Sequence, residues 1–449
     1  MGRRSAALAL AFGITILGTL AICGRAAHAG ESGLWEAEYR AGFGEAVRQS
    51  VRDVFSEPRV YWDRGPVLHT RNKAFALHIG YEGQFDAVWY GGMDAEVEAA
   101  TGQKWLPGFK TRRSRVGVEM FFLRHWYMRV RYGWGSFEFA SFQDLFIEWS
   151  GLSRLPGNWW PTLRLGQVKE AMTIDWMNNA LRTTFAERAM FTSSIIPNRN
   201  VGIRAQGMGP DRRFSYQVGT YLIDAEELSH ESDANGYAVT GRMTALPWAP
   251  KDRPNHLLHV GLAASYRWGF DTFEAKAKPE SWVGPEIVNT GEYIANGGSV
   301  FVGEIFWQRD RLSFTAEGAL TQIRVPGGDT NNYWGCYGQV SYFLTPGHLR
   351  YHRVLGCYGR VKPKRTIFCR TKAGFGDVEI AGRYSILDLN DGTNPGGQAW
   401  SLTAAVNWYL RDNIRVYFNY IYSNVTDAYG VPGANGDMNT LLVRLAYDL

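Results

Sequence analysis

The chain contains few features of a helical membrane protein and little net charge. After residue 23, no apolar run reaches the roughly 20 residues that a membrane-spanning helix needs. Its 48 Lys and Arg nearly balance its 43 Asp and Glu, and the balance is about +2 once three arginines in residues 1–29 are excluded. Net charge therefore gives no basis for a nucleic-acid partner, and only the positions of the charges along the chain can indicate what the protein binds.

Signatures of common catalytic sites are also missing. The sequence has no Gly-x-Ser-x-Gly, no His-Glu-x-x-His and no P-loop motif, and its histidines are scattered without an evident partner set. We expect the protein to use no cofactor and no metal. An enzyme is kept only as an alternative class, because some outer-membrane barrels are phospholipases or proteases. The sequence favours a protein that performs no covalent chemistry.

The N-terminus has the features of an export signal. Arg3 and Arg4 precede an apolar stretch over residues 6–23, and Ala27-His28-Ala29 supplies a small-x-small cleavage site before Gly30. We expect residues 1–29 to be a secretory signal peptide, with a retained anchor as the alternative. Residues 30–72 show weak helical spacing and are expected to form a short periplasmic helix or a disordered leader.

From residue 73 to the end, apolar side chains recur with a period of two. In the last strand, Leu441, Leu445 and Leu449 share one face, whereas Thr440 and Arg444 share the other, because successive strand residues point to opposite sides. One face suits lipid and the other suits water. Segments of this length cross a bilayer as tilted strands, so residues 73–449 are predicted to form an all-β, transmembrane antiparallel β-barrel.

The same pattern predicts about sixteen strands, enough for a barrel with a water-filled lumen. An even number lets the antiparallel hairpins close with both chain ends on the periplasmic side. The expected strands cover residues 75–89, 113–122, 126–134, 142–150, 161–168, 200–208, 212–223, 237–248, 257–268, 298–308, 311–323, 333–344, 374–386, 399–410, 413–424 and 439–449.

One connection is unusually long. Residues 168–199 contain several basic side chains between two expected strands, and a loop of this length in a compact fold is commonly functional. We expect it to fold inward and form a constriction; the alternative is an outward loop at the cell surface. A surface receptor or adhesin would instead use residues 271–297.

Strand parity places basic side chains in the lumen. Arg113 and Arg115 share the polar face of one strand, and Arg129 and Arg131 share that of the next. Guanidinium groups suit oxyanions because they donate two parallel hydrogen bonds. The alternative is that these arginines are solvated wall residues of a general pore.

Several short stretches together resemble the phosphate-selective porins O and P, a family of trimeric, sixteen-stranded outer-membrane channels. The resemblance runs from about residue 75 to the end and rests on the order and spacing of its parts. These are Arg112-Arg113, Leu163-Arg164-Leu165-Gly166-Gln167-Val168-Lys169, Phe185-Ala186-Glu187-Arg188, Asn200-Val201-Gly202-Ile203, Val406-Asn407-Trp408-Tyr409-Leu410 and the terminal strand.

The resemblance implies a homotrimer in the outer membrane of a diderm bacterium, with outer-membrane lipid and phosphate or other small anions as partners. It also implies anion-binding roles at matching positions. The chain departs from the family in its first strand, where phosphate binders place an arginine and this chain has Glu82, with Asp86 nearby. A general pore thus remains the alternative to an anion-selective one. The candidate pore-lining residues are Arg112, Arg113, Arg115, Arg129, Arg131, Lys169, Arg188, Glu82 and Asp86.

Three cysteines follow the predicted signal peptide. Cys357 and Cys369 lie in one connection on the expected periplasmic side, where a disulfide is plausible. His348 and His352 lie in the same connection, so a zinc site is the alternative, although their spacing matches no familiar zinc motif. Cys336 would then be left unpaired.

Overall fold

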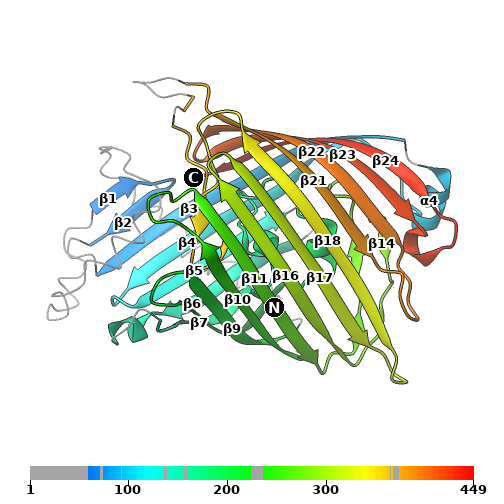
Figure 1. Cartoon of the computed structure of the whole chain (residues 1–449), viewed down its shortest axis with the longest axis horizontal. Helices are drawn as coiled ribbons and strands as arrows, with labels where there is room; N and C mark the ends of the chain where they lie inside the picture. The colour runs from blue at the N-terminus through cyan, green and yellow to red at the C-terminus, as the bar shows by residue number, and fades with distance from the viewer. Residues whose placement is uncertain are drawn as a thin grey trace, which may run out of the picture.

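The chain forms a closed barrel of 16 antiparallel strands (Figure 1). The computed structural model describes residues 59–70, 74–92, 94–135, 139–155, 159–223, 236–364, 366–367 and 374–449. The predicted strand number is confirmed. The barrel strands are β3 (Phe75–Gly91), β4 (Gly108–Phe122), β5 (Trp126–Gly135), β6 (Phe139–Trp149), β7 (Thr162–Lys169), β8 (Arg199–Met208), β9 (Phe214–Leu222), β10 (Tyr237–Trp248), β11 (His256–Trp268), β16 (Gly297–Arg309), β17 (Leu312–Arg324), β18 (Thr330–Phe343), β21 (Asp377–Asp388), β22 (Gln398–Arg411), β23 (Ile414–Thr426) and β24 (Gly436–Asp448).

Short elements fill the connections. The strands are β1 (Arg59–Trp62), β2 (Pro66–His69), β12 (Thr272–Phe273), β13 (Lys276–Ala277), β14 (Val288–Asn289), β15 (Tyr293–Ile294), β19 (Tyr351–His352) and β20 (Cys357–Tyr358). The helices are α4 (Ala95–Thr101), η2 (Gly151–Arg154), α5 (Ile174–Met177), α6 (Met190–Ser194) and η3 (Ala428–Gly430). Within the described part of the chain, no helix is both long and apolar enough to span a membrane.

The barrel closes between its last and first strands. Residues of β24 pair with β3 in a continuous register that ends with Asp448 opposite Glu82. The ladder then extends by one residue, because the amide of Leu449 donates to the carbonyl of Tyr81 and the amide of Tyr81 donates back, each at 2.8 Å. Closure leaves no wall strand with an open edge, which is what a spanning sheet requires in lipid.

The two faces of each wall strand differ as the period of two predicts. In β24, the side chains of Leu441 and Leu445 are about 45% and 42% exposed, whereas Thr440 and Arg444 are fully buried inside the barrel. The outward face is therefore apolar and the inward face polar. This arrangement makes the wall compatible with lipid outside and water inside.

Short turns gather at one end of the barrel. The C-terminus and the hairpin of β1 and β2 lie at that end, and α4 lies at the other (Figure 1). Connections such as 123–125, 310–311 and 412–413 mark it as the periplasmic end, because barrels of this kind have short periplasmic turns and longer extracellular loops.

The hairpin of β1 and β2 differs from the expectation for residues 30–72. In the described part of this segment, residues 59–70, the structure has two antiparallel strands in place of a helix, and β2 continues the sheet through Val67 opposite His78. The remainder of that segment and the predicted signal peptide, residues 1–29, lie outside the described residues.

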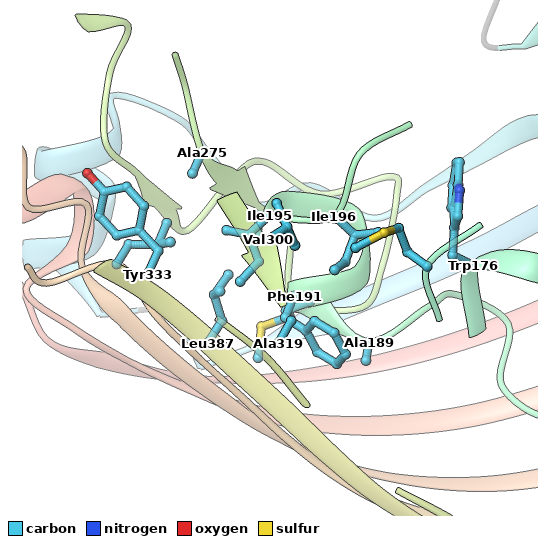
Figure 2. Packing of buried hydrophobic residues seen from close by; sticks show 14 of the residues in the cluster. Trp176, Ala189, Phe191, Ile195, Ile196, Ala275, Val300, Ala319, Tyr333 and Leu387 are labelled. Carbon is cyan, nitrogen blue, oxygen red and sulfur yellow. The ribbon is translucent and has the colours of Figure 1, made fainter. Parts of the chain in front are cut away.

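Apolar packing fixes the long connection 170–198 inside the barrel. Phe191 and Ile195, from α6 and the residue after it, belong to a buried cluster with Val300, Ala319 and Leu387 from three wall strands (Figure 2). All five side chains are at most 8% exposed. The inward path predicted for this loop is therefore confirmed, and apolar burial holds it against the wall.

A second connection, residues 269–296, also enters the lumen. The carboxylate of Glu280 accepts hydrogen bonds from Arg383 at 2.5 Å, Ser385 at 2.5 Å and Thr403 at 2.7 Å. These partners lie on the inward faces of β21 and β22. The interpretation of residues 271–297 as an outward receptor loop is corrected by these contacts.

The third connection that enters the lumen is 344–376, from the periplasmic end. Arg242 of β10 donates to the carbonyls of Leu355 at 2.6 Å and Gly356 at 2.7 Å. The amide of Tyr358 donates to Asn178 Oδ1 at 2.8 Å, so this connection contacts the loop that enters from the opposite end.

Candidate functional site

A β-bulge in β4 brings two consecutive arginines to the lumen. The register pairs Gln84 with Arg113 and Phe85 with Thr111, which leaves Arg112 as an extra residue. Strict alternation would point Arg112 and Arg113 to opposite faces, but a bulge resets the parity of the strand. Arg113 is buried and donates to Gln84 Oε1 at 2.6 Å.

A second bulge acts in the same way in β6. Arg131 pairs with Asp144, and the next pair skips Gln143, so both polar side chains of β6 are directed inward. Gln143 Oε1 then accepts from Arg115 at 3.0 Å. This contact holds the Arg115 guanidinium without using a carboxylate.

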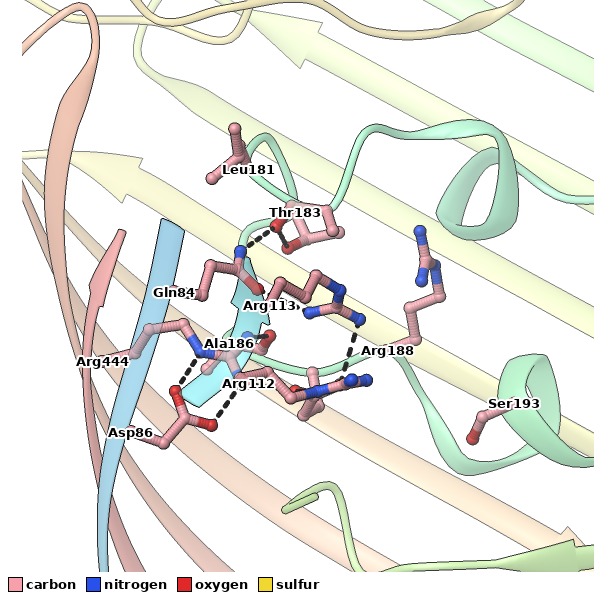
Figure 3. Close-up of polar contacts among 12 residues, drawn as sticks. Gln84, Asp86, Arg112, Arg113, Leu181, Thr183, Ala186, Arg188, Ser193 and Arg444 are labelled. Atoms are coloured by element: carbon pink, nitrogen blue, oxygen red, sulfur yellow. Dashed lines mark hydrogen bonds and ion pairs between the residues drawn. The ribbon is translucent and has the colours of Figure 1, made fainter. Parts of the chain in front are cut away.

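Glu187, near the middle of the inward loop, gathers the guanidinium groups around it. Arg112 donates to its two oxygens at 2.7 and 3.1 Å, Arg113 lies 3.8 Å away, and Arg444 also contacts it. Figure 3 shows the side chains of Arg112, Arg113 and Arg444 close to one another beside Ala186. Burial alone would raise the pKa of Glu187, but Arg112, Arg444 and Arg113 outweigh burial and hold that pKa well below its ordinary value of 4.5. Arg444 is shared with Asp86, at 2.6 Å.

The carboxylate of Glu82 is compensated. Arg131 lies 3.3 Å from it and Arg115 lies 3.9 Å away, while Asn179 of the inward loop donates to it at 3.1 Å. Two cations therefore face the one acid that departs from the family pattern, so Glu82 adds no uncompensated negative charge to the lumen.

Two cations, Lys169 at the start of the inward loop and Arg188 near its middle, donate to backbone carbonyls. Lys169 donates to the carbonyls of Trp176 at 2.6 Å and Asn178 at 2.9 Å. Arg188 donates to the carbonyls of Asp175 at 2.9 Å and Asn178 at 3.0 Å. Carbonyl contacts orient these two basic side chains.

The indole ring of Trp176 is surrounded by the same cations. Lys169 Nζ and Arg188 Cζ each lie 4.9 Å from the ring centroid, and Arg199 Cζ lies 5.6 Å from it. A ring face attracts cations within about 6 Å. Trp176 thus gathers three positive groups without neutralising them.

These groups border a cavity of about 390 Å³ in the lumen, which we call the cationic cavity. Two connections and four strands, β4, β5, β6 and β8, contribute to it. Its basic lining residues are Arg112, Arg113, Arg115, Arg188, Arg199, Lys276 and Lys278, and its acidic ones are Glu187, Glu280 and Glu286.

An aromatic side chain covers one wall of the cationic cavity. Trp282 of the connection 269–296 lies under Arg112, with the guanidinium carbon 4.0 Å from its ring centroid, and Lys278 Nζ lies 4.9 Å from the same ring. Arg112 is therefore positioned by a carboxylate on one side and a ring on the other.

Comparison with protein families identifies this arrangement. The chain matches the family described as phosphate-selective porin O and P over residues 90–449. The chain belongs to this family. The family and the barrel fold indicate a porin of the outer membrane.

Individual relatives are more distant. A protein of Caulobacter vibrioides described as uncharacterized is 27% identical to this porin over 308 residues, a match that covers 63% of this chain and 56% of that relative. This porin therefore aligns with little more than half the length of the relative.

Solved structures share its fold. An anion-selective porin from Comamonas acidovorans has a TM-score of 0.50 and 10% identity, and the match covers 84% of this chain and 100% of that one. The outer membrane channel DcaP of Acinetobacter baumannii has a TM-score of 0.49 and 8% identity, covering 84% and 98%. At 10% identity, the match to the Comamonas porin concerns the barrel architecture alone.

The structure separates the predicted site residues of this porin into two groups. Arg112, Arg113, Arg115 and Arg188 line the cationic cavity together. The rest lie outside its lining. Of these, Arg131 and Glu82 pair with each other, Asp86 pairs with Arg444, Arg129 pairs with Glu119 at 2.9 Å, and Lys169 lies beside Trp176.

Six charged lining residues were not among the predicted site residues: Glu187, Arg199, Lys276, Lys278, Glu280 and Glu286. Glu187 lies within one of the stretches that resemble the family, and Arg199 directly precedes another that begins at Asn200; these stretches were the available signal. Lys276 and Lys278 belong to the connection that the receptor alternative would place at the cell surface, and nothing in their local sequence indicates the lumen.

The cysteines do not form a recognisable site in the described residues. Cys336 and Cys357 are free thiols, and Cys357 is buried; Cys369 lies outside the described residues, so the disulfide stays a prediction. Among the described residues, no group of three or more His, Cys, Asp or Glu side chains could hold a metal ion.

Proposed function

We propose that this porin is a water-filled channel for passive diffusion of small hydrophilic solutes, selective for small anions including inorganic phosphate. The observation that carries the proposal is the cationic cavity, in which basic lining residues outnumber acidic ones by seven to three. Positive groups in a restricted lumen raise the local concentration of anions and reject cations.

Two of the three acids in the cavity are already engaged. Glu187 is held by Arg112, Arg113 and Arg444, and Glu280 is held by Arg383 at the wall. Some of the basic lining residues are engaged as well, because Arg199 pairs with Asp144 at 3.1 Å and Lys276 pairs with Glu274 at 2.9 Å. The proposal therefore depends on the excess of basic over acidic side chains in the lining and not on every cation being unpaired.

Arg113 supports oxyanion binding directly. Its Nε is buried and has no hydrogen-bond partner among the described residues, whereas its Nη1 donates to Gln84 Oε1. A buried donor without an acceptor is costly, and a phosphate oxygen is a suitable acceptor for it. Arg115 and Arg188 line the same cavity, so an anion would pass from one cation to the next.

A general pore is the second candidate, and it has an observation in its favour. The lumen charges are mostly paired, both in the cationic cavity, as in Arg199 with Asp144 at 3.1 Å, and outside it, as in Arg129 with Glu119 at 2.9 Å and Arg164 with Glu148 at 2.5 Å. A lumen in which acids and bases alternate discriminates weakly between ions. The experiment below separates the two candidates.

The test is electrophysiological. The purified protein is reconstituted in a planar bilayer, and the reversal potential is measured across a KCl gradient before phosphate is titrated against the chloride current. A strongly anion-selective current that low phosphate blocks supports the proposal. A weak or cation-directed reversal potential without phosphate block assigns a general pore instead.

We further propose that the mature protein begins at Gly30 and acts as a homotrimer in the outer membrane, without a cofactor and without enzymatic activity. The family resemblance and the pattern of residues 1–29 support this organisation. N-terminal sequencing of the exported protein tests the cleavage site. Light scattering of the detergent complex, corrected for detergent mass, tests the subunit number.

A further inference from the structure

The connection 344–376 has an unusual composition for its position at the periplasmic end of the barrel. It contains eight Lys or Arg and two His residues, but no Asp or Glu. It therefore cannot neutralise its own cations. Any compensating negative charge has to come from elsewhere in the protein or from a ligand.

Part of this connection borders a second cavity, of about 490 Å³, at the periplasmic end. Lys364 and His348 line it on one side, and Arg309 and Arg311, at the tight turn between β16 and β17, line it on the other. We call it the rim cavity. It is separate from the cationic cavity, with which it shares no lining residue.

The cations of the rim cavity form no ion pair with a described residue, although the charge of Arg309 acts on the neighbouring Asp310. Among the described residues, the side chains of Arg309, Arg311 and Lys364 make no ion pair or hydrogen bond, and all three are exposed. The acidic residue that lines the cavity, Asp310, is bound by His256 at 2.9 Å. This differs from the lumen, where most buried arginines have a carboxylate partner.

Register places the rim cavity on the lipid-facing surface. Arg309 of β16 is paired with Leu312 of β17, and Leu312 is paired with Tyr342 of β18, so the three side chains form a row on the outer face. Leu312 is 37% exposed and Tyr342 is 41% exposed. Positive groups and apolar groups thus meet where the wall leaves the bilayer.

We propose that the rim cavity binds the phosphodiester headgroup of an anionic phospholipid from the periplasmic leaflet. Arg309, Arg311 and Lys364 contact the phosphate, and the acyl chains run along Leu312 and Tyr342. Guanidinium groups bind phosphate oxygens through paired hydrogen bonds, and basic pockets beside apolar membrane-facing surface suit this class of lipid.

His348 adds a hydrogen bond and not a charge. Burial, with the nearby positive charges of Arg350 and Lys364, lowers the pKa of His348 below its ordinary value of 6.5. The imidazole is therefore neutral at pH 7 and retains one N–H that can donate to a headgroup oxygen.

Lipid is a better occupant than free phosphate because of where the cavity opens. A translocating anion moves through the lumen, whereas Arg309 lies on the outer face of β16, next to exposed Leu312. A free ion there would gain nothing from the apolar row, while a phospholipid uses both its headgroup and its chains.

Native mass spectrometry of the full-length exported protein in an uncharged detergent tests the proposal. Phosphatidylglycerol and phosphatidylcholine are titrated against wild type and against the double variant Arg309→Gln/Arg311→Gln. The matched control is Lys251→Gln/Arg253→Gln, which removes two exposed cations from the turn between β10 and β11 at the same end.

We expect wild type and the control to retain phosphatidylglycerol in preference to phosphatidylcholine. In the Arg309→Gln/Arg311→Gln variant the affinity for phosphatidylglycerol should fall about 30-fold, because each cation near a membrane surface contributes about 1 kcal/mol. Lys364→Gln alone should lower it about fivefold. The reversal potential should not change, since none of these residues borders the cationic cavity.

Three results would overturn the proposal. The double variant could retain wild-type affinity, the two lipids could bind equally, or millimolar inorganic phosphate could displace the lipid and occupy the cavity alone. The last result would assign the rim cavity to a free anion. Each is read in the same titration, and circular dichroism checks that every variant keeps its strand content.

Discussion

The carboxylate of Glu187 lies 2.7 Å from Nε of Arg112, although 75 residues separate the two in the chain. Glu187 belongs to the inward loop, and Arg112 belongs to the bulge of β4. The loop therefore carries the acid that offsets the charge of the wall. The electrostatic character of the constriction depends on both elements being in place.

Replacing Glu187 with Gln should make the channel more anion-selective. The change removes a negative charge from the cationic cavity and releases Arg112 and Arg113 to bind solute. The reversal potential across a KCl gradient should shift further in the anion direction. A shift toward cations would show that Glu187 matters mainly by keeping the arginines in position.

Replacing Arg113 with Gln should weaken phosphate block by about tenfold or more. A hydrogen bond to a charged group contributes about 1.5 to 3 kcal/mol, and the variant removes the unpartnered Nε donor. Arg129→Gln is the control, because Arg129 is a paired lumen arginine outside the cavity lining. Equal phosphate block in both variants would remove Arg113 from the anion path.

Replacing Trp176 with Leu should loosen the root of the inward loop. The indole ring lies near Lys169, Arg188 and Arg199, and each contact of this kind contributes about 0.5 to 1 kcal/mol. Urea unfolding in lipid vesicles should show a loss of roughly 1 to 3 kcal/mol. Trp176→Phe keeps a ring and should lose less; equal losses would argue that the cations do not use the ring.

Glu187 should remain ionised between pH 7 and pH 5, so its contribution to ion selectivity should not change over this range. The pKa of Glu187 in the folded protein is held well below its ordinary value of 4.5. The ion pairs of Glu187 therefore stabilise the fold fully above pH 4.5, and this stabilisation is lost only as the pH falls through the lower folded-state pKa. Anion selectivity should therefore rise only in strongly acid solution. The Glu187→Gln variant should lack this acid transition in a pH series of reversal potentials.

Replacing Arg415 with Met should destabilise the loop and increase current noise. Arg415 donates to the carbonyls of Thr183 at 2.8 Å and Thr184 at 3.0 Å, and it lies 3.6 Å from Glu379. Removing one member of a buried charge pair costs about 3 to 5 kcal/mol. Urea unfolding measures the loss, and single-channel recording measures the noise.

The control for this variant is Thr321→Val, which removes one hydrogen bond to the carbonyl of Ile195 near the other end of the loop. It should cost only about 1 kcal/mol and leave the current quiet. A quiet channel in the Arg415→Met variant would mean that apolar packing of α6 alone keeps the loop in place.

The wall was predictable because alternation is a local property of a strand. The outward positions of Leu441 and Leu445 and the inward position of Arg444 follow directly from the period of two, as the structure confirms. The parity argument also applies to Arg113 and Arg115, which line the cavity.

The alternation of inward and outward side chains does not hold at a β-bulge. Arg112 would point outward beside Arg113 in a regular strand, and only the bulge turns it inward. Its place in the site was expected from family resemblance and not from spacing. The bulge depends on the pairing of β4 with β3, which no local pattern in β4 reveals.

Long-range charge pairing was not predictable either. Glu82 suggested a negative constriction, but Arg131, Arg115 and Asn179 surround it in the folded barrel. These partners come from two strands and a loop. Lys276 and Lys278 reach the cavity in the same non-local way, from a connection expected outside.

The amino-acid sequence by itself determined the barrel: its strand number, its inward and outward faces and the long connection available for a constriction, because each depends on neighbouring residues along one segment. Tertiary structure alone decided which loops enter the lumen, which arginines are paired and which remain free. Those outcomes depend on side chains that meet only when the sheet closes and the connections compete for the same enclosed space.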